Sequence, residues 1–279
     1  SRLAESSESL KLGGERKNMT FLFSDIRGFT AISESYKSNP EELTDLINNL
    51  LTVLSDEILN NNGTIDKYMG DCIMAFWNAP TDQSDHSDLA LKASFDMEKA
   101  LQEFNINFKK DKGMELKIGI GINTGECIVG NMGSEKRFDY TVLGDPVNLA
   151  SRLEGQSGTY GFQRIVGAET VNNLQTDACL FEVDLIQVKG KSEPVKIYTS
   201  FENFSLVDDA LMEFKNDHKN FLQSYRNQQW ERALNHLQRW EDKVEEFDLY
   251  FTIFKDRIKD LEINLVDPNW NGAYVATTK

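Results

Sequence analysis

The sequence contains little cysteine and no long apolar run, and both shortages restrict the class of protein it encodes. The three cysteines, Cys72, Cys127 and Cys179, are widely spaced and form neither a CxxC motif nor a Cys/His ligand spacing. A disulfide framework and a zinc site are therefore not indicated, and a reducing, cytoplasmic setting is expected. No segment approaches the roughly 20 apolar residues of a membrane span, and no signal segment opens the chain.

Positive charge is also scarce. The chain carries 30 lysines and arginines against 45 aspartates and glutamates, a formal net charge of −15. This balance opposes non-specific binding to nucleic acid or to an anionic membrane surface, so no nucleic-acid partner is expected. A polyphosphate ligand would need metal cations to bind here. With 279 residues, 40% of them apolar, the chain can form a substantial core, and its length favours two compact units, the first being larger.

The chain opens with Ser-Arg-Leu, and its first methionine is Met19. We therefore expect a fragment whose upstream portion, a membrane or sensor region, lies outside this sequence. Residues 1–18 are polar and contain Gly13-Gly14. This composition predicts a linker leading from the upstream region into the first folded unit.

Residues 19–202 alternate between strand-like and helix-like patterns. The apolar run 19–26 ends at Asp25-Ile26 and predicts a buried strand. A hairpin is expected with its turn at Gly70, and two strands are expected on either side of Asn123-Thr124-Gly125. Amphipathic helices are predicted at 40–59, at 84–110 and from 145 onward. Further strands are predicted at 138–144, 163–167, 180–188 and 195–201. The mixture indicates an α+β or α/β domain.

Residues 203–279 form a helical extension by the same reasoning. No glycine or proline occurs from Leu206 to Leu265, and aromatic residues recur at helical spacing. The pattern predicts a separate unit of three helices at 206–226, 229–241 and 243–262, stacked as a tetratricopeptide-like hairpin and a third helix. Its partner stays open, and capping of the catalytic unit is the simplest role.

Two acids at the ends of short apolar runs, Asp25 and Asp71, are candidate metal ligands. Hard cations such as Mg²⁺ and Mn²⁺ prefer carboxylate oxygens, and two such ions can bridge phosphate oxygens. Either aspartate alone is more simply a capping or turn residue. The three histidines, His86, His218 and His236, are expected at the surface, because the chemistry considered below needs no histidine base.

Three multi-residue blocks change the interpretation of these acids. FSDIRGFT (23–30), KYMGDCIMAFW (67–77) and YTVLGDPVNLASRLE (140–154) occur in this order. With them the chain resembles the catalytic domain of class III nucleotidyl cyclases from about Lys11 to Phe201. The resemblance implies an α+β fold with a ferredoxin-like core, whose central, mostly antiparallel sheet is flanked by helices.

The resemblance also implies the metal and phosphate ligands. Asp25 and Asp71 would bind two Mg²⁺ or Mn²⁺ ions per active site, with the backbone carbonyl of Ile26 as a further ligand. The turn from Ile26 through Phe29 to Thr30 would cradle the phosphates. The resemblance further assigns triphosphate contacts to Arg164 and to Lys191 or Lys189, although Lys191 alone is more simply a solvated turn residue.

The remaining roles concern the nucleoside and the transition state. By the resemblance, Lys67 and Thr141 read the adenine edge, Asn148 orients the ribose, and Arg152 stabilises the pentavalent phosphorus. Asn148 and Arg152 are four residues apart and so share one helix face. Lysine can donate to adenine N1 but cannot accept from guanine N1–H, so adenine is favoured. Thr141 resembles the subgroup that includes bicarbonate-responsive cyclases.

The implied activity is that of an adenylyl cyclase, which converts ATP to 3′,5′-cyclic AMP and pyrophosphate. In this family the metal aspartates come from one chain and the remaining site residues from another, so a head-to-tail homodimer is implied. We expect the cytoplasmic domain of a membrane-anchored receptor cyclase. Guanylyl cyclase activity and a catalytically silent dimerisation module remain alternatives. A diguanylate cyclase would need a GG[DE]EF turn, which this sequence lacks.

Overall fold

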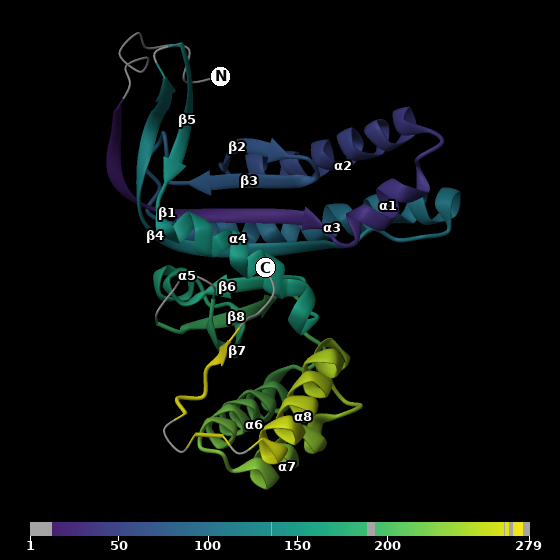
Figure 1. Ribbon diagram of the computed structural model, residues 1–279, viewed down its shortest axis with the longest axis vertical. Coiled ribbons are helices and arrows are strands. Elements are labelled where there is room, and N and C mark those ends of the chain that lie inside the picture. The colour runs from purple at the N-terminus through teal and green to yellow at the C-terminus, as the bar shows by residue number, and fades with distance from the viewer. Residues whose placement is uncertain (1–12, 135, 189–192, 265, 268–269, 276–279) are drawn as a thin grey trace.

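The computed structural model describes residues 13–134, 136–188, 193–264, 266–267 and 270–275. Strands and helices alternate through the first two thirds of the chain, and helices follow (Figure 1). The strands are β1 (Gly13–Ile26), β2 (Thr64–Met69), β3 (Cys72–Trp77), β4 (Ile118–Ser134), β5 (Arg137–Leu143), β6 (Arg164–Gly167), β7 (Cys179–Gln187), β8 (Val195–Phe201) and β9 (Tyr274–Val275). The helices are α1 (Phe29–Ser35), α2 (Pro40–Asn60), α3 (His86–Lys112), α4 (Asp145–Tyr160), α5 (Ala168–Asn173), α6 (Asp208–Arg226), α7 (Trp230–Trp240), the 3₁₀ helix η3 (Glu245–Phe247) and α8 (Asp248–Ile263).

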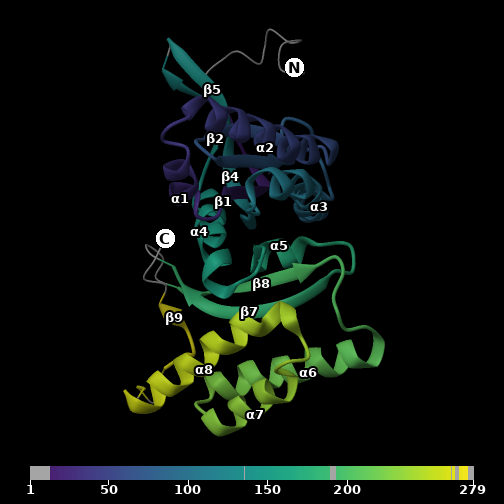
Figure 2. The ribbon, with the colours of Figure 1, turned by 90° about the vertical axis from the view of Figure 1, so that its right-hand side faces the viewer.

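The strands form one mixed sheet in the order β2-β3-β1-β4-β6-β8-β7-β9, with β5 paired to β4. Most neighbours are antiparallel, and the described parallel pairs are β4 with β6 and β7 with β9. The expected α+β architecture, a mostly antiparallel sheet flanked by helices, is confirmed. The hairpin of β4 and β5 projects from one end of the molecule, and α6–α8 lie at the other (Figures 1 and 2).

The two faces of the sheet are covered by different helices. Alternate residues of β1 point to opposite faces, as a strand requires. Leu22 packs with residues of α2 and α3, whereas Phe21 and Phe23 pack with Val147 and Ala150 of α4. Asp25 has the same parity as Phe21 and Phe23, so it belongs to the face that α4 covers.

Two strands are longer than the sequence predicted. β1 begins at Gly13, because residues 13–18 of the expected linker pair with β4. The predicted break at Asn123-Thr124-Gly125 is wrong, since these residues pair with β1 inside the continuous strand β4. The polar side chain of Thr124 is accommodated inside the sheet because its buried hydroxyl lies 2.7 Å from that of Thr20 and 3.0 Å from that of Thr170.

The helical extension continues the core of the sheet. Phe162, just before β6, and Phe181 of β7 share one hydrophobic cluster with Phe214, Phe247 and other residues of α6 to α8. The expectation of a separate unit is therefore corrected in one respect: α6, α7 and α8 are predicted well, but they do not have a core of their own. Strand β9 joins the sheet beside β7.

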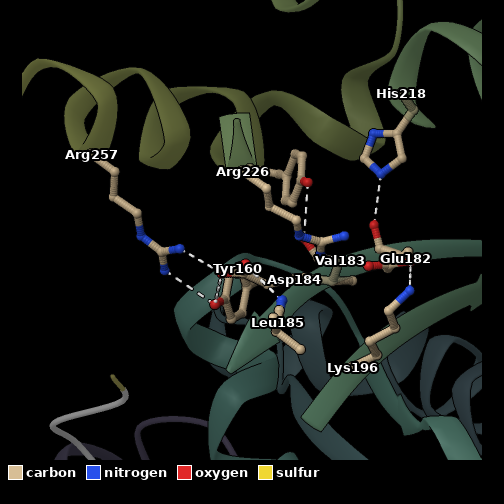
Figure 3. A network of polar contacts seen from close by, with 10 residues as sticks. Tyr160, Glu182, Val183, Asp184, Leu185, Lys196, His218, Arg226 and Arg257 are labelled. Carbon is tan, nitrogen blue, oxygen red and sulfur yellow. Dashed lines mark hydrogen bonds and ion pairs between the residues drawn. The ribbon is translucent and has the colours of Figure 1, made fainter. Parts of the chain in front are cut away.

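Buried polar contacts lie at the same junction (Figure 3). Asp184 of β7 accepts hydrogen bonds from Tyr160 at 2.6 Å and from Arg257 of α8 at 2.5 Å. Glu182 pairs with Arg226 of α6 at 2.5 Å. Because a buried charge is costly unless it is paired, these contacts fix how the extension docks on the sheet.

Two of the three histidines are buried, against expectation. His86 is 7% exposed and lies 2.7 Å from the Thr20 hydroxyl, and His218 is 5% exposed and donates to the Glu182 carbonyl at 2.7 Å. Each finds a polar partner on a distant strand, which the local sequence does not reveal. Within the described ranges, no helix is both long and apolar enough to cross a bilayer.

Candidate active site

The two predicted metal ligands meet at one end of the sheet. Asp25 is the penultimate residue of β1, and Asp71 lies in the turn between β2 and β3. The backbone N–H of Ile26 donates to Asp25 Oδ1 at 2.9 Å and is 3.3 Å from Asp71 Oδ2. Residues 46 positions apart are thus held around one amide, as the hairpin predicted at Gly70 requires.

This pair carries more negative charge than its surroundings compensate. The pKa of Asp25 is raised to about 7 by burial, by a hydrogen bond to Asp71, and by the charges of Asp71 and Glu154. Burial and the Asp71 charge also raise the pKa of Glu154, which lies on α4. These neighbouring carboxylates repel one another when they are ionised, and a bound cation would relieve that repulsion.

The donor atoms fit a hard divalent cation. Cys72 lies beside the pair, but burial and the charges of Asp25, Glu154 and Asp71 raise its pKa to about 12, so the thiol stays protonated. Oxygen donors remain, as Mg²⁺ and Mn²⁺ prefer. Among the described residues no group of three His, Cys, Asp or Glu side chains forms a metal cluster. The two aspartates therefore fit metal ions whose other ligands come from main-chain, water or substrate oxygens.

The predicted phosphate turn follows directly after Asp25. Gly28 caps α1 with φ of 70°, a left-handed conformation that glycine adopts without strain. Thr30 is exposed, whereas Phe29 is half-buried and packs against the core beneath α2 and α3. The Phe29 ring thus anchors the turn to the core. Gly28 and the Thr30 side chain remain exposed to solvent.

One side of helix α4 is exposed to solvent at Asn148, and another side carries Glu154, whose charge acts on Asp25. Asn148 is exposed, and Arg152 is half-buried with its Nη1 atom lacking a hydrogen-bond partner among the described residues. The α4 residue whose charge acts on Asp25 is Glu154. Glu154 is two positions beyond Arg152, about 200° away around a helix. Arg152 therefore lies on the side of α4 opposite Glu154.

The two predicted base-reading residues converge on a third residue. The Thr141 hydroxyl on β5 donates to Asp66 Oδ2 at 2.9 Å, and Lys67 Nζ lies 3.6 Å from the same oxygen. The Asp66 side chain is 1% exposed, whereas that of Lys67 is 44% exposed. Strands β2 and β5 are thus joined at this point, and the lysine ammonium remains accessible.

Arg164 is buried and bonded within the protein, so its predicted phosphate contact stays a prediction. Its side chain is 2% exposed and its guanidinium is occupied inside the protein, where Nη1 donates to the Ser200 carbonyl at 2.7 Å and Nη2 to Glu98 of α3. The guanidinium also stacks on the Phe95 ring, 4.3 Å from its centroid. Arg164 therefore ties α3 to the sheet. Lys189 and Lys191 lie outside the described residues, so their predicted phosphate contact stays a prediction.

Three residues of the site were missed from the sequence: Arg27, Asp66 and Glu154. All three lie inside the quoted blocks or directly beside them, which was the available signal. Arg27 follows Ile26, donates to the Phe162 carbonyl at 2.5 Å, and lies close enough to Glu154 for their charges to interact. Burial lowers the pKa of Arg27, and the Glu154 carboxylate opposes that change.

Comparison with known proteins identifies the family that this site belongs to. The chain is a member of the family described as "Adenylate and Guanylate cyclase catalytic domain", which matches residues 14–201. An adenylate cyclase of Anabaena cylindrica is 36% identical over 200 residues, covering 68% of this chain and 38% of that protein. Adenylate cyclase 1 of Rhizobium meliloti is 32% identical over 194 residues, covering 68% of this chain and 29% of that protein. The chain thus spans about a third of the length of these curated relatives.

Solved structures agree on the fold. The adenylyl cyclase CyaB from P. aeruginosa matches with a TM-score of 0.64 and 37% identity, over 71% of this chain and 100% of that chain. The guanylyl cyclase Cya2 matches with a TM-score of 0.61 and 36% identity, over 70% of this chain and 98% of that chain. Because an adenylyl and a guanylyl cyclase match almost equally well, general similarity does not select the base. That choice depends on individual residues.

Proposed function

We propose that this protein is an adenylyl cyclase that forms 3′,5′-cyclic AMP and pyrophosphate from ATP. The observation that carries the proposal is the pairing of Asp25 and Asp71 around the Ile26 amide, with an excess of negative charge and oxygen donors only. This is the arrangement that a cation-dependent reaction of a nucleoside triphosphate needs. We propose as well that this chain is the cytoplasmic domain of a receptor cyclase that has a membrane anchor and an upstream sensor.

The reaction requires the ribose 3′-oxygen to lose a proton and attack the α-phosphorus in line with the departing pyrophosphate. Bound Mg²⁺ or Mn²⁺ would supply charge compensation for the phosphates and lower the pKa of the 3′-hydroxyl. Asp25, Asp71 and the Ile26 carbonyl would hold these ions. The backbone from Ile26 to Thr30 would orient the phosphates, so that the triphosphate enters with its leaving group already positioned.

Asn148 and Arg152 would act on the nucleoside and on the developing charge. Asn148 would hold the ribose, and Arg152 would donate to the phosphoryl oxygens as negative charge grows in the transition state. The unpartnered Nη1 of Arg152 supports this role, because a buried guanidinium nitrogen without a partner is costly in the absence of substrate.

We infer further that each site is shared by two chains of a head-to-tail homodimer. Glu154, not Arg152, is the residue on α4 that acts on Asp25 in the same chain, and Asn148 is exposed on another side of the helix. The arginine that contacts the substrate bound at these aspartates therefore comes more readily from a second copy of the chain. A dimer of this kind contains two equivalent sites.

Lys67 favours adenine over guanine in this proposal. Its ammonium can only donate hydrogen bonds, which suits adenine N1 and opposes guanine N1–H. A guanylyl cyclase remains the competing enzyme, since Cya2 has nearly the same similarity to this chain as CyaB. A silent dimerisation module is the competing non-enzyme, and it would give no reason for the strained acid pair at Asp25.

The test is nucleotide turnover by the purified protein with Mn²⁺ across a series of protein concentrations. We expect cyclic AMP from ATP, much less cyclic GMP from GTP, and a specific activity that rises with protein concentration as dimers form. Asp25→Ala should abolish the product. Absence of cyclic AMP at every concentration, or a preference for GTP, would contradict the proposal.

A mixing experiment tests the shared site directly. Asp25→Ala and Arg152→Ala chains should each be inactive alone, since every homodimer site then lacks one essential group. In a heterodimer one of the two sites regains both wild-type residues, so equal mixing should restore about a quarter of the wild-type activity. An unchanged, inactive mixture of chains shown to exchange would argue that each chain builds its own site.

A further inference from the structure

An irregularity in β2 places Asp66 beside Lys67. In a regular strand neighbouring side chains point to opposite faces. The pairing of β2 with β3 shifts between Ile65 and Lys67, whose partners are the consecutive residues Ala75 and Met74. Asp66 is therefore the extra residue of a bulge, a feature that re-aims side chains and is common next to active sites.

The contacts of Asp66 connect both base-reading residues. Its Oδ2 atom accepts from the Thr141 hydroxyl at 2.9 Å and lies 3.6 Å from the Lys67 ammonium. Its Oδ1 atom is buried and has no hydrogen-bond partner among the described residues. With a side chain only 1% exposed, Asp66 is held in place and acts on its neighbours from inside the protein.

The direction of the bond to Thr141 matters chemically. A threonine hydroxyl has one proton and two lone pairs, so alone it can either donate to a base or accept from it. A carboxylate can only accept, so the Thr141 proton points to Asp66. What Thr141 then offers to a bound base is its lone pairs.

We propose that Asp66 sets the hydrogen-bond polarity of the base-reading pair and thereby selects adenine over guanine. Lys67 is held as a donor and Thr141 as an acceptor, which matches the N1 acceptor and the N6 amino donor of adenine. Guanine presents the opposite pattern, an N1–H donor and an O6 acceptor. Asp66 is a positioning residue that acts through its neighbours. This inference rests on the proposed function, because it concerns how the same site reads its nucleotide.

The experiment compares ATP with GTP in single preparations of each variant. Asp66→Asn keeps the shape but adds a donor, so Thr141 is free to reverse its hydroxyl. We expect the ratio of kcat/KM for ATP to that for GTP to fall about tenfold or more, mainly through KM. Because both nucleotides are assayed on the same protein, a smaller folded fraction cancels from the ratio.

Asp139→Asn is the matched control. Asp139 lies on β5 two residues before Thr141, is exposed, and its charge reaches Asp66. Its substitution removes the same charge but leaves the bond between Thr141 and Asp66, so the ratio should not change. An equal fall in both variants would attribute the effect to net charge and overturn the proposal.

A double-mutant cycle tests whether Asp66 acts through the hydroxyl. Thr141→Val should lower the ratio by itself, and adding Asp66→Asn should lower it little further. Full additivity, or no change in the ratio with Asp66→Asn, would overturn the inference while leaving adenylyl cyclase activity intact. If the wild type gives no product, competition of ATP and GTP for a fluorescent ATP analogue with Mn²⁺ reports the same ratio, so failure of the function and of this inference are distinguished.

Discussion

Asp25 is held in a position that its own charge disfavours. Its pKa of about 7 means that the folded protein accommodates the neutral acid more favourably than the carboxylate, chiefly because of burial and then of Asp71. Such an arrangement lowers the stability of the metal-free protein above the pKa and improves its affinity for a cation. Active sites commonly accept this exchange of stability for function.

The exchange predicts that Asp25→Asn stabilises the protein while abolishing its response to metal. At about pH 8 the wild-type acid is ionised beside Asp71, and the neutral amide removes that repulsion. We expect a melting temperature equal to or a few degrees above that of the wild type without metal. Mn²⁺ should raise the melting temperature of the wild type but not that of Asp25→Asn.

Asp56→Asn, an exposed substitution on α2, is the control and should retain the full Mn²⁺ response. A lower metal-free melting temperature for Asp25→Asn would contradict the idea that Asp25 is strained. A retained Mn²⁺ shift would show that the cation binds elsewhere.

At the level of elements, the geometry of the candidate active site depends on how closely α4 approaches β4. A Cβ atom added at Gly121 would lie 2.2 Å from both the Ala150 carbonyl oxygen and the Glu154 backbone nitrogen. Backbone therefore packs on backbone, and the helix that carries Asn148 and Arg152 is positioned by the absence of a side chain. Glycine is required at position 121 because a larger side chain would collide with the backbone of α4, and not because of an unusual backbone angle.

Gly121→Ala is expected to displace α4 and to cost about 1–3 kcal/mol of unfolding free energy. Cyclase activity should fall further than the folded fraction does, because Asn148 and Arg152 move with the helix. Gly158→Ala on the same helix, where nothing lies within 4 Å of the new Cβ, is the matched control. It should be neutral or stabilising by about 0.5–1 kcal/mol. Chemical denaturation beside activity assays distinguishes the two, and equal effects would refute this packing argument.

The elements that could be predicted from sequence are those with local signals. Apolar periodicity indicated α2 and α3, and the glycine turn brought Asp71 to Asp25. The errors arose where a residue's partner is distant in sequence. The sequence predicts a break at Thr124 because this residue is polar. In the folded protein its hydroxyl is hydrogen-bonded to those of Thr20 and Thr170, so the strand continues. The bulge at Asp66 depends on pairing with β3, and the burial of Arg164 depends on Glu98 and Ser200.

At the scale of the whole molecule, the extension and the sheet behave as one folded body. His218 of α6 lies at the junction among aromatic rings of both parts and donates through Nε2 to the Glu182 carbonyl of β7. Burial lowers its pKa to about 4. The folded state therefore keeps this histidine neutral over a pH range in which the unfolded chain is protonated.

The consequence is a pH-dependent stability that belongs to the junction. In the unfolded chain His218 binds a proton below its ordinary pKa of 6.5, whereas in the folded protein it does so only near pH 4. The contribution of this group to stability is therefore fully present above pH 6.5 and is lost as the pH falls toward 4. The loss from this group is roughly 3 kcal/mol. Urea unfolding between these pH values should show a shallower decline for His218→Phe.

His236→Gln is the control, since this histidine of α7 is half-buried and lies away from the hydrogen bond to β7. The slope of the wild type should persist in that variant. A wild-type slope in His218→Phe would assign the pH dependence to other groups.

The shared core also has a consequence for the order in which the protein is made. Residues that match the cyclase family end at position 201, but Phe181 on β7 shares its hydrophobic cluster with Phe214 of α6, Phe247 of η3 and residues of α8, which follow that position. A ribosome releases the chain from its amino end, so the catalytic sheet emerges with one side still bare. The aspartates of β1 and of the turn before β3 are thus translated before the residues that cover β7, and the sheet that contains β1 is complete only when β9, which follows α8, pairs with β7.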